Sequence, residues 1–508
     1  RVFHDRPYVI ADAILNTMGS MQHTFGVREL IRAGLQDLDK ARELLQELQD
    51  NGVSDDRLQS LMATLEHSCD PDVALRNLID IIKALQSQGR RFDDIVTSGE
   101  GLTRLVTVLG VSDEMGKLMR FRPELVAAAA NDACESHLYN HAQRRAHVLE
   151  AVGADPQESA MPKASLPLSE AATALRQTYR KQLAAIMAQD AMETDPTTIQ
   201  PRISQELSDL ADAALEGALA IARNEIEGSE HVRFTIIGMG KLGAQELNYV
   251  SDVDLIYVVE PADPDTNGMT LNRIGTKLAT TLQRVCQSVI MGVAEPTLWQ
   301  IDGGLRPEGK DGPLVRRLES HEAYYEQWAE NWEFQALLKA RPVAGDPELG
   351  KAYMDMTRPF VWTASKRDNF VYDCQQMRKR VEDLIPAPLK DREIKLGRGG
   401  LRDVEFTVQM LQLVHGRSDE SLRTRSTLES LQALADDQIA PVEQPAGAYE
   451  VAQKITVEDA HIRFDVPVFA ADRQIRACTP NPGAWCELHA HADAEPATLH
   501  VLRAQPAD

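Results

Sequence analysis

Two aspartates stand two residues apart at the start of a short apolar segment, and they constrain what this segment can form. Residues 253–259 have the composition of a buried strand, and Asp252 and Asp254 lie at its beginning. Alternate residues of a strand point to the same face, so the two carboxylates lie side by side. Neighbouring carboxylates repel each other and lose hydration unless a cation lies between them. The pair therefore predicts a strand that holds a metal ion.

A glycine-rich turn precedes these aspartates. The apolar run 234–237 is followed by Gly238-Met-Gly240-Lys241-Leu-Gly243, and such a turn offers backbone N–H groups to phosphate oxygens. The same residues fit the GxGxxG pattern of dinucleotide-binding proteins, with Glu260 closing the next strand. That fold requires a longer helix than residues 241–250 allow, and its second strand should be almost continuously apolar. We therefore favour metal-dependent phosphate chemistry over a nicotinamide-dependent oxidoreductase.

A third carboxylate follows in another predicted strand. Asp302 lies within residues 297–305, directly before two glycines and Arg306. Two metal ions that clamp the attacking and leaving oxygens usually need such an additional acidic ligand. Magnesium takes oxygen ligands. We therefore predict that Asp252, Asp254 and Asp302 are the catalytic metal ligands, with Mg²⁺ or Mn²⁺ as the cofactor.

The remainder of the chain is mostly helical by its pattern. Residues 1–229 predict successive helices, residues 230–345 the core with the sheet, and residues 346–438 a second helical domain. Prolines and short β-like runs mark residues 439–508 as a separate tail. We expect an α+β fold in which a small mixed sheet is flanked by mostly helical N- and C-terminal regions.

Composition excludes several classes of protein. The chain has 54 basic and 77 acidic residues, a net charge of 54 − 77 = −23, which argues against a broad nucleic-acid-binding surface. No segment approaches the ~20 consecutive apolar residues that a membrane span needs. The six cysteines are scattered, with no zinc-ligand spacing. We expect a cytoplasmic protein without nucleic-acid or membrane partners.

Four segments, in this order, closely resemble the glutamine synthetase adenylyltransferase/adenylyl-removing enzymes, which belong to the polymerase-β-like nucleotidyltransferases. The segments are GMGKLGAQELNYVSDVDLIYV, IDGGLRPEGKDGPLV, WEFQALLKARPVAGD and IKLGRGGLRDVEFTVQMLQL, and the resemblance extends over residues 29–435. It implies a nucleotidyltransferase core between helical regions. Members of this family carry two such cores. One core transfers AMP from ATP to a tyrosine of glutamine synthetase, and the other removes that AMP by phosphorolysis to ADP.

The single core of this chain is most similar to the adenylyl-removing half. The resemblance therefore implies glutamine synthetase, inorganic phosphate and ATP or ADP as partners, and the PII signal protein as a further one. Adenylyl transfer from ATP remains an alternative within the same fold. A non-catalytic module that binds glutamine synthetase or PII is a second alternative, which the three intact aspartates disfavour.

The resemblance also implies roles for individual residues. Asp252, Asp254 and Asp302 would hold the metals. The predicted phosphate-binding residues are Gly238, Gly240, Lys241, Gly243, Ser251 and Arg306. Residues that could support the site are Lys339, Arg341, Arg402 and Glu405. For Lys339 and Arg341, stabilisation of a helix C-terminus is an equally good interpretation. We expect Trp328 and Trp332 to belong to the core rather than to stack on a nucleotide.

The tail resembles a different protein. Residues 452–485 and their surroundings are similar to the C-terminal domain of methionyl-tRNA formyltransferase. The catalytic domain of that enzyme is absent here, so the resemblance implies no formyl transfer. A fusion of two sequences would explain both this tail and the single core.

Overall fold

The computed structural model describes residues 25–131, 140–264, 266–390, 392–435, 458, 460–462, 474–475, 484–488 and 497–501. The chain separates into two compact units, residues 1–439 and residues 440–508, which are described here one at a time. Of the helices in the described residues, none is both long enough and apolar enough to cross a lipid bilayer.

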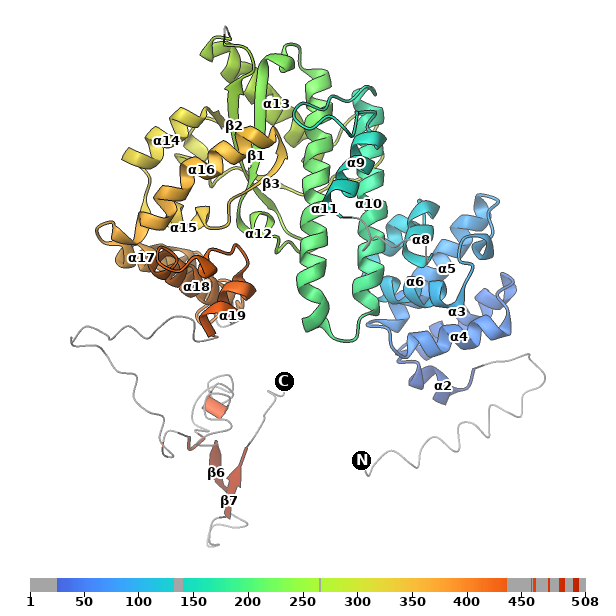
Figure 1. Cartoon of the computed structure of the whole chain (residues 1–508). Coiled ribbons are helices and arrows are strands. Elements are labelled where there is room, and N and C mark those ends of the chain that lie inside the picture. The colour runs from blue at the N-terminus through green and yellow to red at the C-terminus, as the bar shows by residue number, and fades with distance from the viewer. Residues whose placement is uncertain are drawn as a thin grey trace, which may run out of the picture. The chain divides into compact units, whose positions relative to one another are not determined.

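Short amphipathic helices build the N-terminal part of the first unit (Figure 1). In α5 (Pro71–Ser87), Asp70 accepts a hydrogen bond from the Val73 N–H and so caps the helix, and Pro71 takes the first helical position, where no N–H is needed. Apolar residues at helical spacing then form one shared core. The other helices of this part are α2 (Val27–Arg32), α3 (Leu38–Asp50), α4 (Asp55–Leu65), α6 (Gly99–Val111), α7 (Asp113–Met119) and α8 (Pro123–Ala130).

Two long helices, α10 (Leu168–Met192) and α11 (Pro196–Glu225), pack against each other beside the sheet (Figure 1). The shorter α9 (His141–Ala151) packs on α11. Most of α11 is buried, including the polar residues Ser208, Asp209, Asp212 and Glu216. A helix that is buried on nearly all sides contacts several neighbours, and its polar groups therefore need partners from those neighbours.

The sheet is small and mixed. Its strands are β1 (Val232–Gly238), β2 (Val253–Pro261), β3 (Ile301–Asp302), β4 (Val315–Arg316) and β5 (Arg341–Gly345). β1 pairs antiparallel with β2 and with β5, whereas β3 and β4 pair parallel with β2. This arrangement confirms the predicted α+β class. The third predicted strand is shorter than residues 297–305, because it pairs with β2 at only two positions.

Both faces of the sheet are covered. Phe234 and Leu255 point into a core shared with α11 and α13 (Gly268–Gln287), while Ile237 and Ile256 point into a core shared with α14 (Leu318–Gln327) to α16 (Pro347–Thr363). The alternation follows from the two-residue period of a strand.

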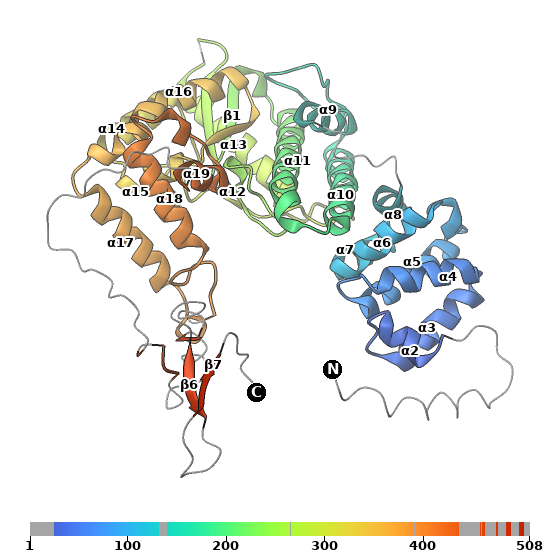
Figure 2. The same ribbon diagram turned by 60° about the horizontal axis from the view of Figure 1, so that its bottom comes forward.

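The last helices of this unit lie beside the end of the sheet at which β2 begins (Figure 2). They are α15 (Asn331–Leu337), α17 (Phe370–Asp383), α18 (Leu401–His415) and α19 (Thr427–Ala435). The turn between β1 and β2 contains the four-residue helix α12 (Gly240–Gly243). Single 3₁₀ turns are η1 (Phe92–Asp94), η3 (Ser229–His231), η4 (Gly309–Asp311), η5 (Ala364–Lys366), η6 (Ala387–Leu389) and η7 (Glu420–Leu422).

The second unit contains a β-hairpin. β6 (Trp485–Leu488) pairs antiparallel with β7 (Ala497–His500). Ile462 N donates to Trp485 O at 2.7 Å, and a small apolar core forms around Ile462 and Cys486. The described parts agree with the short β-like runs expected of the tail.

Candidate active site

The parallel pairing of β2 with β3 brings the predicted metal ligands together. Asp254 is the register partner of Asp302, and Asp252 lies two residues earlier at the start of β2. Burial raises the pKa of Asp254 to about 6, and the negative charge of Asp302, and more weakly that of Asp252, adds to this shift. The carboxylates therefore interact, as the sequence predicts.

The three carboxylates form an open group. They do not all approach within 4.8 Å of one another, judged on the described residues. Asp302 Oδ1 accepts a hydrogen bond from Gly304 N at 2.7 Å, which fixes it at the start of its loop. Carboxylate oxygens are the ligand type that Mg²⁺ or Mn²⁺ prefers. The chemistry of these side chains thus fits a hard divalent cation, whereas their positions do not yet surround a single ion.

Gly240 brings the glycine-rich turn against Asp254. Its φ is +53°, and a Cβ built on it would lie 2.5 Å from Asp254 Oδ2. A side chain there would have both a disfavoured backbone conformation and a clash. Met239 N donates to Asp254 O at 2.8 Å. The turn is therefore held directly beside the central carboxylate.

Two other glycines of the motif have a packing role instead. Gly238 lies within the sheet between Leu255 and Arg341, and a Cβ on it would lie 2.6 Å from Val343 Cγ1. A Cβ on Gly243 would overlap the Lys339 carbonyl oxygen. The prediction that Gly238 and Gly243 contact phosphate is thus not supported, since both allow α12 and the strands to pack closely.

A cleft of about 410 Å³ opens beside Asp252 and Asp254. Its polar lining includes Lys241, Asn248, Ser251, Gln335, Lys339, Lys395, Arg402, Glu405 and Gln409. Burial lowers the pKa of Lys241, and the nearby positive charges of Lys395, Arg402 and Lys339 lower it further. A cleft with carboxylates on one wall and four cationic side chains around it suits a metal-bound phosphate compound.

Lys339 connects α18 and α19 to the segment that follows the glycine-rich turn. Its Nζ lies 2.8 Å from Glu246 Oε2, 3.1 Å from Glu405 Oε1 and 3.1 Å from Thr427 Oγ1. Arg402 Nη1 also donates to Glu405 Oε2 at 2.7 Å. Burial alone would raise the pKa of Glu405, but Lys339 and Arg402 outweigh it and lower that pKa. The structure therefore brings Lys339, Arg402 and Glu405 together in the cleft wall.

Arg306 does not reach the cleft. Its guanidinium donates to the carbonyl oxygens of Gly303 (2.6 Å), Lys310 (3.1 Å) and Gly312 (3.0 Å). These contacts close the loop between β3 and β4. The predicted interaction of Arg306 with phosphoryl oxygens is therefore replaced by a loop-stabilising role.

Arg341 also faces away from the cleft. Its Nη1 and Nη2 form an ion pair with Asp212 at 2.5 and 3.1 Å, and Nη2 donates to Leu242 O at 3.0 Å. Neither interpretation given for Arg341 describes this role, because its partner lies 129 residues away in the sequence.

The prediction for the two tryptophans is wrong. Trp328 is 74% exposed, and Trp332 lines the cleft with its Nε1 donating to Glu330 Oε2 at 2.8 Å. Lys395 is a cleft residue that the sequence reasoning did not assign. Its position in the segment 395–406, which also contains Arg402 and Glu405, could have indicated that Lys395 belongs to the site.

Three segments of the chain match models of known protein families. Residues 102–356 match the family model described as glutamate-ammonia ligase adenylyltransferase, which is about half of the chain. Residues 375–453 match a model described as GlnD PII-uridylyltransferase, and residues 454–508 match the formyl transferase C-terminal domain. Both predicted resemblances are confirmed.

Curated relatives are named bifunctional glutamine synthetase adenylyltransferase/adenylyl-removing enzymes. One from Bifidobacterium longum (strain DJO10A) is 75% identical over 408 residues, which cover 80% of this chain and 38% of the relative. One from Cutibacterium acnes is 44% identical over 408 residues, covering 80% and 40%. One from Streptomyces avermitilis is 42% identical over 421 residues, covering 82% and 39%. The chain thus spans about two fifths of the length of these relatives.

Proposed function

The chain belongs to the glutamate-ammonia ligase adenylyltransferase family, and from this premise we propose that it removes AMP from the adenylylated tyrosine of glutamine synthetase. The reaction is metal-dependent phosphorolysis, which releases ADP and contributes to the regulation of nitrogen assimilation. The observation that carries the proposal is the single cleft in which Asp252 and Asp254 face Lys241, Lys395 and Arg402.

The reaction exchanges one ester bond for one anhydride bond. An oxygen of inorganic phosphate attacks the α-phosphorus, the bond from phosphorus to the tyrosyl oxygen breaks, and the phenolate takes up a proton. Bound Mg²⁺ or Mn²⁺, held by Asp252, Asp254 and Asp302, would neutralise phosphate charge and orient the attacking oxygen.

The side chains of the cleft have separate tasks. Lys241, Lys395 and Arg402 bind phosphate oxygens as positive charges. Gly240 lets the backbone approach the phosphates beside Asp254, and Ser251 lines the same wall. A cleft of about 410 Å³ is of the size that holds a small ligand. Trp332 supplies an aromatic surface at its edge.

We assign the removing rather than the transferring direction because the motifs are most similar to the adenylyl-removing half of the family. Residues 375–453 match a PII-uridylyltransferase model, which supports a relation to the nucleotidyl transfer that acts on PII. The PII signal protein is therefore a proposed regulatory partner, alongside glutamine synthetase as the substrate.

The deciding experiment is an assay of ADP release. Adenylylated glutamine synthetase, inorganic phosphate and MgCl₂ are incubated with the full chain and with Asp252→Asn, Asp254→Asn and the control Asp355→Asn, an exposed residue of α16. We expect phosphate-dependent ADP release that falls at least about 100-fold in the first two variants and stays unchanged in the control. AMP incorporation from ATP into unmodified glutamine synthetase, without ADP release, would instead assign the transferring direction. Full activity of both aspartate variants would contradict metal-dependent catalysis in this cleft.

A further inference from the structure

Behind the glycine-rich turn, α11 presents buried acidic side chains that the proposed reaction does not use. Asp209 Oδ1 accepts a hydrogen bond from Gln245 Nε2 at 3.0 Å. Both oxygens of Asp212 pair with Arg341, at 2.5 and 3.1 Å. Asp209 and Asp212 lie three residues apart and so share one face of the helix. This face contacts Gln245, in the segment after α12, and Arg341, at the start of β5.

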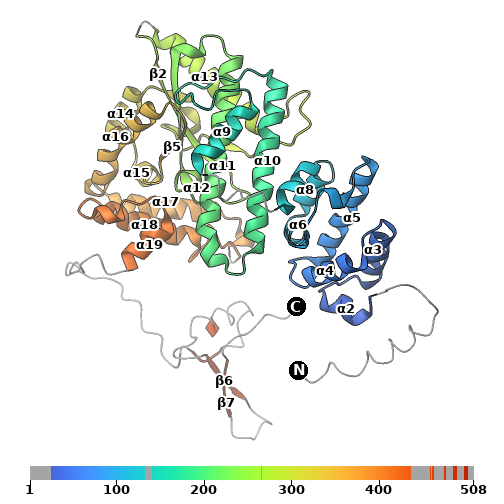
Figure 3. The same ribbon diagram turned by 45° about the vertical axis from the view of Figure 1, so that its right-hand side comes forward.

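Arg341 connects Asp212 to the turn itself. Its Nη2 donates to Leu242 O at 3.0 Å and its Nε donates to Gly243 O at 3.3 Å. These two carbonyl groups are the last of α12, and the first two residues of α12 line the cleft. Figure 3 shows α11 passing close to α12. A shift of the Arg341 guanidinium would therefore move the turn that faces Asp254.

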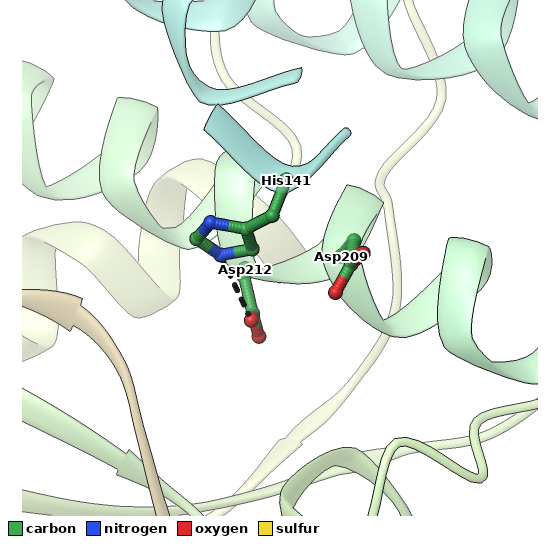
Figure 4. Close-up of side chains that lie close together, drawn as sticks. All are labelled: His141, Asp209 and Asp212. Atoms are coloured by element: carbon green, nitrogen blue, oxygen red, sulfur yellow. Dashed lines mark ion pairs between the residues drawn. The ribbon is translucent and has the colours of Figure 1, made fainter. Parts of the chain in front are cut away.

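His141, the first residue of α9, completes this cluster. Its Nε2 lies 3.3 Å from Asp212 Oδ2, and Figure 4 shows the ring directly above Asp212, with Asp209 to one side. One ligand atom from each of the three residues lies within 4.8 Å of the others. Two carboxyl groups face a single guanidinium, and burial raises the pKa of Asp209, so a proton on His141 reduces the remaining negative charge of the group.

The charged groups around His141 favour that proton. The hydrogen bond to Asp212 is the largest influence and raises the pKa of His141, and the charges of Asp212 and Asp209 act in the same direction. Burial and the positive charge of Arg341 act against it, and so does the N-terminal end of α9, but the net direction is upward.

We propose that Asp212 and His141 are positioning residues, which hold the glycine-rich turn in the conformation that binds nucleotide phosphate. A metal ion at this cluster is disfavoured because Arg341 already occupies both oxygens of Asp212 and would repel it. The inference rests on one part of the proposed function, which is that the cleft binds a nucleotide.

The test measures binding of MgADP to the full chain by calorimetry between pH 6 and pH 8.5. His141→Gln removes the charge, His141→Lys keeps it at every pH, and His231→Gln is the control, because His231 is an exposed residue whose ion pair is with Glu230. Protonation of ADP and of Asp254 changes the Kd of the wild type and of every variant in the same way. The readout is therefore the ratio of each variant's Kd to that of the wild type.

The positive charge of His141 is present below its raised pKa and is lost as the pH rises through it. At pH 6 we expect a Kd about fivefold weaker in His141→Gln than in the wild type, which corresponds to ~1 kcal/mol. As the pH rises through the pKa of His141 this difference closes, and His141→Lys then binds more tightly than the wild type. A second measurement uses Asp212→Asn, in which amide hydrogen exchange over residues 240–247 should become at least about tenfold faster.

Three outcomes would overturn the inference. One is a Kd ratio for His141→Gln that stays at one across the pH range, with melting temperatures that show every variant to be folded. Another is unchanged hydrogen exchange over residues 240–247 in Asp212→Asn. The third is stoichiometric uptake of Zn²⁺ by the wild type that His141→Gln abolishes, which would make the cluster a metal site. Failure of every form, including the wild type, to bind MgADP would instead remove the proposed function and this inference together.

Discussion

Asp254 on β2 and Asp302 on β3 are direct partners in a parallel strand pair, and their mutual repulsion helps to raise the pKa of Asp254 to about 6. In the metal-free protein, Asp254 is ionised above that pH and protonated below it. A divalent cation needs the ionised form, so binding of Mn²⁺ should weaken as the pH falls through about 6.

The variant Asp302→Asn tests this relationship. Removal of the neighbouring negative charge lowers the pKa of Asp254, so the pH midpoint for Mn²⁺ binding should shift downward while the affinity at pH 8 falls about tenfold through loss of a ligand. Electron paramagnetic resonance of Mn²⁺ from pH 5 to pH 8 measures both quantities. An unchanged midpoint would show that the two carboxylates are not coupled.

Gly240→Ala should abolish most activity without unfolding the protein. The added methyl group meets Asp254 Oδ2 and forces a positive φ on alanine, so the turn must move away from the carboxylate. We expect phosphorolysis to fall at least about 100-fold. Gly268→Ala is the matched control, because a Cβ there meets nothing within 4 Å.

Lys339→Met should destabilise the junction between the core and the last helices. The side chain of Lys339 is 7% exposed, and its removal leaves Glu246 and Glu405 close together without their cation. The free energy of unfolding in urea should fall by about 3 kcal/mol. Lys351→Met, which removes an exposed pair with Asp355, should change it by less than about 1 kcal/mol. Equal losses in the two variants would contradict a buried ionic junction.

His321 should make the fold sensitive to acid. Burial, followed by the positive charge of Arg316, lowers the pKa of His321 to about 3 from its ordinary 6.5. Between these pH values the unfolded chain binds one more proton than the folded chain, so stability is full above pH 6.5 and falls as the pH decreases toward 3. The variant His321→Phe should show a shallower decline in unfolding free energy between pH 7 and pH 4. His231→Phe, at an exposed position, should retain the wild-type decline.

Removal of residues 440–508 should leave the first unit folded. The two units have separate cores, and the boundary falls at Ile439 and Ala440. A chain ending at Ile439 should keep the main thermal transition within about 2 °C and keep its phosphorolysis rate. A cooperative loss of near-ultraviolet circular dichroism after truncation would show that the tail is part of the first unit.

The sequence predicted those parts of the site that depend on local pattern. The apolar runs and the Asp252–Asp254 spacing determine a strand with two carboxylates on one face. This alternation is a local property of a strand and does not depend on which elements pack against it. Asp302 was proposed because a second metal needs a third carboxylate and Asp302 lies within a predicted strand, although a turn residue before two glycines was an equally good interpretation. Lys241 and Ser251 were implied by the resemblance to the family.

The sequence could not show those contacts of the site whose two residues lie far apart in the chain. Asp212 lies on a helix rich in leucine and alanine, where acidic residues are typical of a solvated face. Only the tertiary structure shows that this face is covered by Arg341, which is 129 residues away. In the same way, the glycines of the motif separate into Gly240, which faces the cleft, and Gly238 and Gly243, which permit packing, only when β5 is in place.

The three partners of Lys339 come from positions 93 residues before it and 66 and 88 residues after it. Lys339 and Glu405 line the cleft, so this part of its wall is held in place by contacts between distant stretches of the polypeptide. During translation the sheet and its aspartates emerge well before Thr427 does. A nascent chain that has not yet reached Thr427 therefore lacks one of the three contacts of Lys339, and this junction is completed only near the end of synthesis of this unit.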